Sequence, residues 1–291
     1  MTSAWLQFIA SGLTAGAIYA LVALGFAIVF NASGAINFAQ GEFVMVGGMS
    51  AVSFLAMGVP LPLAIALAVA ASVVVALLIE RVAVSPARNA GTVTLIIITI
   101  GVALFLRGLA QLVWGKGVFR LPGFSGEEPI AFFGATLLPQ SLWVMGGAAL
   151  AVLALGAFYG RTLAGKAMLA TSYNKLAAQL VGINTRAVLF ASFGLAAALG
   201  AIGGVLIAPI AFTSYDAGIM LGLKGFAAAM LGGLGSFAGA VLGGVVLGLL
   251  EGLGAGFVSS AYKDAIAFVV ILAVLFFLPG GLLGARHSDR V

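Results

Sequence analysis

A chain of 291 residues in which 63% of the side chains are hydrophobic and only 7% are charged cannot cover a water-facing surface, because soluble domains carry about 25% charged residues. Its 13 Lys and Arg residues exceed its 8 Asp and Glu residues, but they form no basic stripe, which argues against nucleic-acid binding. There is no cysteine, and the one histidine is His287 in the tail, so thiolate chemistry is excluded and a metal site is not expected.

Apolar segments long enough to cross roughly 30 Å of hydrocarbon recur along the whole chain. We expect them at about 5–30, 37–57, 61–80, 92–113, 141–159, 187–209, 220–235, 237–257 and 262–278. The polar break at 31–34 and the short, Gly-rich segment 220–235 favour broken or re-entrant helices. The predicted fold class is therefore all-α: one polytopic transmembrane helix bundle over residues 1–291, with about eight to nine hydrophobic segments.

The distribution of basic residues predicts the orientation. Basic residues without balancing acids lie in 81–88, 161–186 and 286–290, which the positive-inside rule places in the cytoplasm. The mixed-charge, Pro-containing connection 114–140 fits the outer side. The first Lys or Arg is Arg81, so the first apolar segment is expected to be retained as a helix, and the side of the N-terminus stays open. Arg107 lies within a span, and we expect it to snorkel to the outer interface.

Polar residues gather where the first two apolar segments meet. Asn37, Gln40 and Glu42 flank Gly41 there. Polar groups at membrane depth are tolerated where they line a water-filled path, and a helix that begins there points its positive end at a carboxylate. An ordinary interfacial turn is the alternative. Lys224 and Thr94 are weaker candidates for the same path, because lysine also snorkels and threonine hydroxyls commonly bond to their own helix.

The cytoplasmic connection 161–186 contains a predicted amphipathic helix at 168–181, which starts near Thr171 or Ser172 and ends at Gly182. The apolar side of such a helix needs a partner, either the membrane surface or another protein. The spacing Ala177-Ala178-x-x-x-Gly182 resembles the loop through which ABC importer permeases contact their ATPase, although Leu176 stands where many such loops have Glu.

Two apparent nucleotide-binding motifs do not fit their context. Residues 160–167 nearly match a P-loop, but Ala167 replaces the hydroxyl residue that holds magnesium. Residues 233–238 match a dinucleotide fingerprint that has meaning only after a strand. The glycines at positions 12, 16, 244, 248, 252 and 256 recur every four residues instead, a spacing that predicts close packing between membrane helices.

Three stretches, 12–48, 166–184 and 222–251, together resemble the permeases of the branched-chain amino acid ABC transporter family (the LivH type). The first is similar to the family's N-terminal segment, the second to its coupling loop and the third to its second Gly-rich half. The resemblance implies a multi-pass protein of the bacterial inner (plasma) membrane. It also implies four kinds of partner besides lipid: a second homologous permease subunit, two cytoplasmic ATPase subunits and a periplasmic substrate-binding protein.

The resemblance, together with the residue patterns described above, assigns a substrate path and an ATPase contact residue by residue. The substrate-path residues are Asn37, Phe38, Gln40, Gly41, Glu42, Thr94, Lys224 and Phe226, with Gln40 where the family often has His. The ATPase-coupling residues are Thr171, Ser172, Leu176, Ala177, Ala178 and Gly182. The chain is not expected to be an enzyme or to hold a cofactor, because ATP and Mg²⁺ belong to the partner ATPases.

The implied cargo is a branched-chain or related hydrophobic amino acid. Urea, short amides and aromatic acids are alternatives within the same importer class. An ion-coupled secondary transporter is the alternative from another class. It would carry membrane-buried carboxylates, for which Glu42 and Glu251 are the candidates.

Overall fold

The computed structural model describes residues 2–87, 90–132, 135–257 and 259–284. In chain order the elements are α1 (Thr2–Ser33), α2 (Gln40–Ala56), α3 (Leu61–Ile79) with a π-helical turn (Glu80–Val84), α4 (Thr92–Trp114), β1 (Ile130–Phe132), β2 (Ala135–Leu137), α5 (Pro139–Arg161), α6 (Leu163–Tyr173), α7 (Lys175–Leu180), α8 (Thr185–Ala211), α9 (Ala217–Gly232), α10 (Phe237–Phe257), a 3-10 turn (Ser260–Tyr262) and α11 (Lys263–Phe277). The two strands form an antiparallel hairpin.

The predicted all-α bundle is confirmed. Within the described residues, six helices are long and apolar enough to cross a membrane: Ala4–Ser33, Leu61–Val84, Thr92–Trp114, Pro139–Arg161, Thr185–Ala211 and Phe237–Phe257. The other three predicted segments coincide with the shorter helices α2, α9 and α11, of 17, 16 and 15 residues. The expected total of about eight to nine hydrophobic segments therefore stays a prediction.

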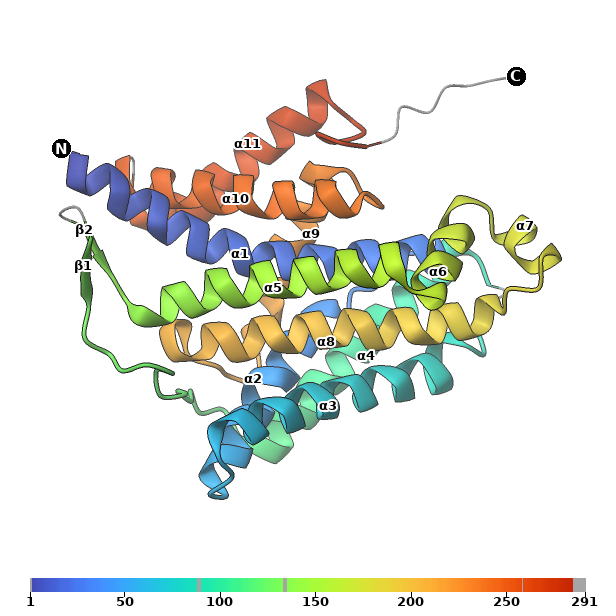
Figure 1. The fold of residues 1–291 in the computed structure, drawn as a ribbon, viewed down its shortest axis with the longest axis horizontal. Coiled ribbons are helices and arrows are strands. Elements are labelled where there is room, and N and C mark those ends of the chain that lie inside the picture. Colours follow the sequence, from blue (N-terminus) through green and yellow to red (C-terminus); the bar gives the residue numbers. More distant parts are fainter. Residues whose placement is uncertain (1, 88–89, 133–134, 258, 285–291) are drawn as a thin grey trace.

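The two ends of the bundle are built differently. The β1–β2 hairpin and the start of α1 lie at one end, and α6 and α7 lie at the other (Figure 1). The side chain of Gln7 accepts a hydrogen bond from the backbone N–H of Thr136 at 2.8 Å, which joins the start of α1 to β2. If the basic connection 161–186 lies in the cytoplasm, as expected from its charge, the start of α1 is predicted on the outer side. Arg88 and the basic stretch 286–290 lie outside the described residues.

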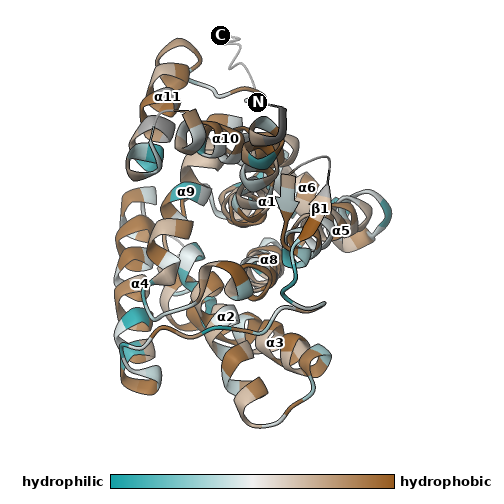
Figure 2. Cartoon of the chain, turned by 90° about the vertical axis from the view of Figure 1, so that its left-hand side faces the viewer, coloured by the Kyte–Doolittle hydropathy of each residue, from teal (hydrophilic) through white to brown (hydrophobic). Residues whose placement is uncertain are grey.

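The central helix is α1, which lies among α8, α9 and α10 when the bundle is viewed along its length (Figure 2). Its tightest neighbour is α10. A Cβ added at Gly248 would collide with the backbone of Gly16, and one added at Gly12 would lie 2.8 Å from the carbonyl oxygen of Gly248. The predicted glycine stripe is confirmed as a packing surface. Without side chains between them, the two backbones approach closely enough for dispersion forces to hold them together in lipid.

The chain turns back into the bundle at two places. After α1 ends at Ser33, Gly34 adopts a left-handed conformation, with φ of 73°, and residues 34–39 lead to the start of α2. There Gln40 packs against Gly25, which lies roughly 12 Å before the end of α1. The corresponding segment 212–216 leads from α8 to α9, where Gly218 packs directly on Gly41. The starts of α2 and α9 therefore meet inside the bundle.

The predicted single helix at 168–181 is wrong. Asn174 has extended backbone angles (φ −154°, ψ 103°) and separates α6 from α7. Its side chain accepts a hydrogen bond from the backbone N–H of Ala177 at 2.9 Å, so Asn174 caps a new helix instead of continuing the old one. The predicted end at Gly182 is confirmed, since this residue has φ of 87° and the next helix, α8, begins only at Thr185.

Candidate functional site

The polar residues before α2 lie in the interior of the bundle. Asn37 and Gln40 are 1% and 0% exposed. The Asn37 Oδ1 atom accepts from the backbone N–H of Ala39 at 3.1 Å, and the Gln40 Nε2 atom donates to the carbonyl of Ala196 on α8 at 2.9 Å. The remaining polar atoms of these side chains, Asn37 Nδ2 and Gln40 Oε1, have no hydrogen-bond partner among the residues that the structure describes. Buried polar atoms of this kind call for a ligand, a water or a partner.

Glu42 forms an ion pair with Arg107 on α4. The carboxylate Oε1 lies 2.7 Å from an Arg107 guanidinium nitrogen, and the two side chains are 2% and 25% exposed. The expectation that Arg107 snorkels to the interface is therefore wrong: a buried carboxylate holds the guanidinium toward the bundle. The contact uses one oxygen and one nitrogen. Glu42 Oε2 and Arg107 Nε are buried and have no hydrogen-bond partner in the described protein.

Both charged groups line a cavity of about 240 Å³ between α1, α2, α4 and α9. The rest of its wall is almost entirely apolar: Phe26, Phe38, Ile100, Ala103, Leu104, Gly218, Ile219, Gly222, Leu223 and Phe226. The ring of Phe226 packs against those of Phe26 and Phe38, with centroid distances of 5.6 and 5.5 Å. An apolar cavity with a few convergent polar groups is the usual form of a small-molecule site.

Lys224 points away from this cavity. Residues 218, 222 and 226 of α9 face the cavity, and Lys224 lies on the opposite face of the helix, as the 3.6-residue period requires. Its ammonium group contacts Glu251 Oε1 at 2.8 Å and Asp264 Oδ1 at 2.7 Å. It also donates to the hydroxyl of Tyr19, which itself donates to Glu251 Oε2. This cluster borders a second cavity of about 430 Å³.

Of the predicted path residues, Phe38, Glu42 and Phe226 share one cavity, and Gly41 packs against Gly218 and Gly222 in its wall, while Asn37 and Gln40 do not line it. Thr94 lies on an exposed face of α4. Thr99, one turn further on, is buried and its hydroxyl accepts from the backbone N–H of Phe38 at 3.2 Å. Sequence reasoning missed the role of Arg107, although a charge inside a span was the available signal.

The predicted ATPase-coupling residues divide into buried and exposed sets. Thr171 and Ala178 are 3% exposed and hold α6 and α7 in place. Exposed apolar side chains cover the outside of this pair of helices: Leu163, Tyr173, Leu176, Leu180 and Val181. They lie at the end of the bundle opposite the hairpin (Figure 1). A cluster of exposed apolar residues beside a basic connection is typical of a protein contact surface.

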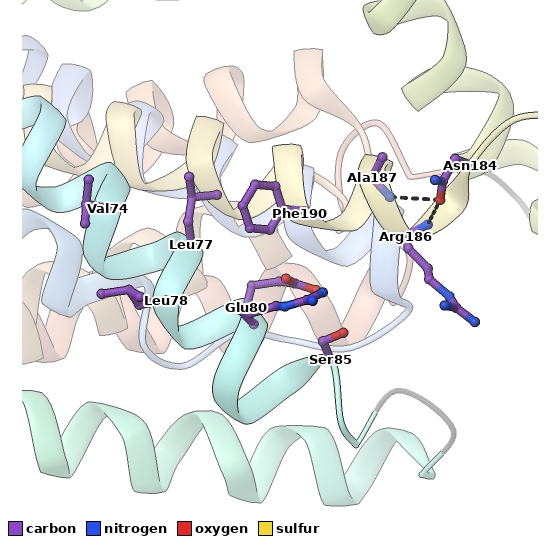
Figure 3. A pocket seen from close by; sticks show the side chains of 10 residues that line it. Val74, Leu77, Leu78, Glu80, Ser85, Asn184, Arg186, Ala187 and Phe190 are labelled. Atoms are coloured by element: carbon purple, nitrogen blue, oxygen red, sulfur yellow. Dashed lines mark hydrogen bonds between the residues drawn. The ribbon is translucent and has the colours of Figure 1, made fainter.

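A further cavity, of about 610 Å³, is a groove between the end of α3 and the start of α8 (Figure 3). Arg81, Glu80 and Arg186 lie at its polar end, and Asn184 caps α8 by accepting from the backbone N–H groups of Arg186 and Ala187. The apolar wall includes Val74 and Leu78, which are more than half exposed on the outside of the bundle. None of the predicted site residues lines this groove.

A bundle of long apolar helices with two shorter helices that begin inside it, a buried ion pair in an apolar cavity and an exposed apolar surface at its basic end is the form expected of an integral membrane transporter. Comparison with known proteins gives the family. Residues 8–275 match the family described as branched-chain amino acid transport system / permease component. The chain belongs to this family of transport permeases, and it is a multi-pass inner-membrane protein.

Relatives match over almost the whole chain. The high-affinity branched-chain amino acid transport system permease protein LivH of Escherichia coli K12 is 36% identical over 303 residues, covering 99% of this chain and 98% of its own. The corresponding protein BraD of Pseudomonas aeruginosa is 35% identical over 301 residues, with the same coverage. The probable branched-chain amino acid transport permease protein LivH of Methanocaldococcus jannaschii is 27% identical and covers 91% of this chain and 88% of its own.

Proposed function

We propose that this chain is the membrane-spanning permease subunit of an ATP-driven importer of branched-chain or related hydrophobic amino acids. The observation that carries the proposal is the match to branched-chain amino acid permeases over 99% of the chain. The match includes the segment before α2, the two short helices of the connection 161–186 and α9. Residues 1–291 act as a single transmembrane domain, and the substrate passes the cavity beside Phe38, Glu42 and Phe226.

A second homologous permease subunit covers the face formed by α4, α9 and α11. These helices lie along one side of the bundle, and α5 lies on the opposite side (Figure 2). The cavity with Glu42 and Arg107 opens between α4 and α9. A charged pair that faced lipid at this depth would be unfavourable, so protein must cover it. The substrate path then runs between the two subunits.

Two cytoplasmic ATPases bind the exposed apolar surface of α6 and α7, and ATP and Mg²⁺ are bound by them. A periplasmic binding protein delivers the substrate to the end that carries the β1–β2 hairpin. We infer nine crossings in all. Six are made by the long helices, one by α11, and two by α2 and α9, each continued by the extended segment that precedes it. This places the N-terminal end outside and the end of α11 inside.

Two alternatives have less support. Urea and short amides can hydrogen-bond to the ion pair, but they carry no charges to match its two poles. An ion-coupled transporter needs a membrane-buried carboxylate free to bind its coupling ion. Glu42 is paired with Arg107, and Glu251 is paired with Lys224.

Reconstitution of the chain with its partners tests the proposal. The permease pair, the ATPases and the loaded binding protein are placed in liposomes, and uptake of radiolabelled leucine, isoleucine and valine is measured with and without ATP. We expect accumulation that requires ATP, the ATPases and the binding protein. Accumulation by the chain alone, driven by a sodium or proton gradient, would contradict the proposal.

The contact with the ATPases is tested separately with Leu180→Asp. Leu180 is 81% exposed on α7, so the substitution leaves the interior of the bundle unchanged. We expect the variant to insert normally but to lose co-purification of the ATPases and most ATP-driven uptake. Val118→Asp, a 69% exposed apolar residue beyond the end of α4 on the outer side, is the matched control and should retain both. Equal behaviour of the two variants would refute the assignment of this surface.

A further inference from the structure

We propose that Glu42 and Arg107 form a recognition pair for a zwitterionic amino acid: Glu42 Oε2 binds the α-ammonium group, Arg107 binds the α-carboxylate, and the aliphatic side chain lies among the phenylalanine rings. This inference rests on the proposed function and adds to it the chemical basis on which the membrane subunit itself selects its substrate.

The unused atoms of the ion pair carry the inference. A side-on, bidentate contact would satisfy both oxygens of Glu42 and two nitrogens of Arg107. Here the pair makes one contact of 2.7 Å, and Glu42 Oε2 and Arg107 Nε are buried with no hydrogen-bond partner in the described ranges of the chain. Leaving such atoms unsatisfied is costly. An α-amino acid has a group for each of these atoms: its ammonium can donate to Glu42 Oε2, and its carboxylate can accept from Arg107 Nε.

Helix ends in the same wall reinforce the carboxylate position. Gly218, the second residue of α9, lines the cavity, and Glu42 is the third residue of α2. Neither helix is capped at its start by a side chain. The positive ends of both helices are therefore directed toward this region, where they favour an anionic group. The absence of a Cβ at Gly218 and Gly222 lets a ligand approach the α9 backbone.

The apolar part of the wall sets the class of side chain. Phe26, Phe38 and Phe226 pack ring against ring, and Leu104 of α4 and Leu223 of α9 line the same cavity. The volume of about 240 Å³ suits a free amino acid rather than a peptide. Each additional buried methylene strengthens binding by roughly fourfold, so leucine, isoleucine and valine are favoured over alanine and glycine.

The balance of charge excludes other amino acids. Glu42 and Arg107 have a net charge of zero, and a bound zwitterion keeps the cluster neutral. A substrate with an additional charge, such as glutamate or lysine, would leave that charge unpaired at membrane depth. A molecule with one pole would satisfy only one of the two unpartnered atoms. The cavity therefore favours neutral, apolar α-amino acids.

Binding to the complex without its binding protein tests this inference. The permease pair with its ATPases is placed in nanodiscs, and tritiated leucine binding is measured by scintillation proximity. We expect valine and isoleucine to displace the label. 4-Methylpentanoate, which lacks the ammonium group, and 3-methylbutylamine, which lacks the carboxylate, should each compete at least about tenfold more weakly, the loss of one charged hydrogen bond. These measurements use the unaltered protein, so they do not depend on the folding of a variant.

The variant Glu42→Gln tests whether the Glu42 carboxylate binds the ammonium group of the substrate. Glutamine retains an oxygen that accepts from Arg107, so the link between α2 and α4 is kept while the negative charge is lost. We expect leucine affinity to fall about tenfold or more. Glu80→Gln, the same change at a buried carboxylate outside the cavity, should leave it unchanged.

The outcomes separate the two proposals. If unaltered protein shows no saturable leucine binding, if the two single-pole analogues compete as well as valine, or if Glu42→Gln binds leucine normally, the recognition pair is refuted. The proposed function would still stand in these cases if the reconstituted importer accumulates leucine with ATP. If that importer accumulates no branched-chain amino acid, the proposed function itself fails.

Discussion

At the scale of single residues, the two buried clusters of charge on either side of α9 have different roles. In the cavity, Glu42 and Arg107 keep unpartnered atoms. On the opposite face, Lys224 binds Glu251, Asp264 and Tyr19 at once, and so joins α9 to α10, α11 and α1. Membrane helices lack a hydrophobic drive to associate, so polar links of this kind contribute to holding them. The first cluster is suited to a ligand and the second to structure.

We therefore expect replacement of Lys224 to lower the stability of the protein rather than to change its substrate selectivity. Lys224→Met leaves the 7% exposed Glu251 side chain with Tyr19 and with Lys263, whose ammonium lies 3.5 Å away. Loss of one partner of a buried pair costs on the order of 3 kcal/mol. We expect a lower thermal unfolding temperature in detergent. Lys116→Met, at an exposed lysine of the outer connection, is the control. Equal unfolding temperatures for the two variants would contradict the structural role.

The sequence indicated the members of the site better than their arrangement. Glu42 and Phe38 were expected in the path from the motif around them, and they share its cavity. Arg107 was noticeable in the sequence as a charge within a span. Its partner Glu42 lies 65 positions away, however, and the sequence around neither residue indicates that the two form a pair. Lys224 was placed in the same path because its sequence neighbours belong there. A shift of two residues along a helix turns a side chain to another face, and the direction of that turn depends on tertiary packing.

At the scale of elements, the apolar segments and the polar breaks between them predicted the order of the helices. The polar break at 31–34 marked the end of the first helix. The division of 168–181 into α6 and α7 was missed, because the apolar pattern continues through Asn174 while its side chain caps a new helix. The meeting of the starts of α2 and α9 inside the bundle was also beyond the sequence. It follows from contacts such as Gly41 on Gly218, which join segments far apart in the chain.

The contact between α1 and α10 gives a prediction at this scale. Gly248→Ala introduces a Cβ that would collide with backbone atoms of Gly16, and backbone cannot move aside as a side chain can. We expect the two helices to separate, with a loss of stability on the order of 1–3 kcal/mol. Gly156→Ala, on an exposed face of α5 with open space around it, is the matched control.

The measurement is thermal unfolding of both variants in the same detergent. The control should be neutral or slightly stabilising, because alanine favours helix more than glycine does. If Gly248→Ala were as stable as Gly156→Ala, the close approach of α1 and α10 would not be a packing requirement.

At the scale of the whole molecule, the chain has an incomplete site. The cavity of Glu42 and Arg107 lies at the face of α4 and α9, and Arg107 is 25% exposed there. The apolar surface of α6 and α7 is likewise uncovered. A substrate site at a pairing face and a contact surface at the cytoplasmic end are connected by the rigid helices between them. In the proposed importer, movement of the ATPases therefore opens and closes the face between two permeases without a deformation of either bundle.

Cross-linking in the assembled importer tests which face is paired. The sequence has no cysteine, so one introduced cysteine can be labelled alone with a benzophenone maleimide. Ile97→Cys places the probe on α4, and Leu150→Cys places it on α5, at the opposite side of the bundle (Figure 2). The two side chains are 63% and 68% exposed, so the substitutions disturb the interior equally little.

After illumination, the Ile97 variant should form a covalent product of two permease subunits, because the partner covers α4. The Leu150 variant should react with lipid. A subunit–subunit product from Leu150 and none from Ile97 would move the pairing face to α5, and the ion pair of the cavity would then need a different cover.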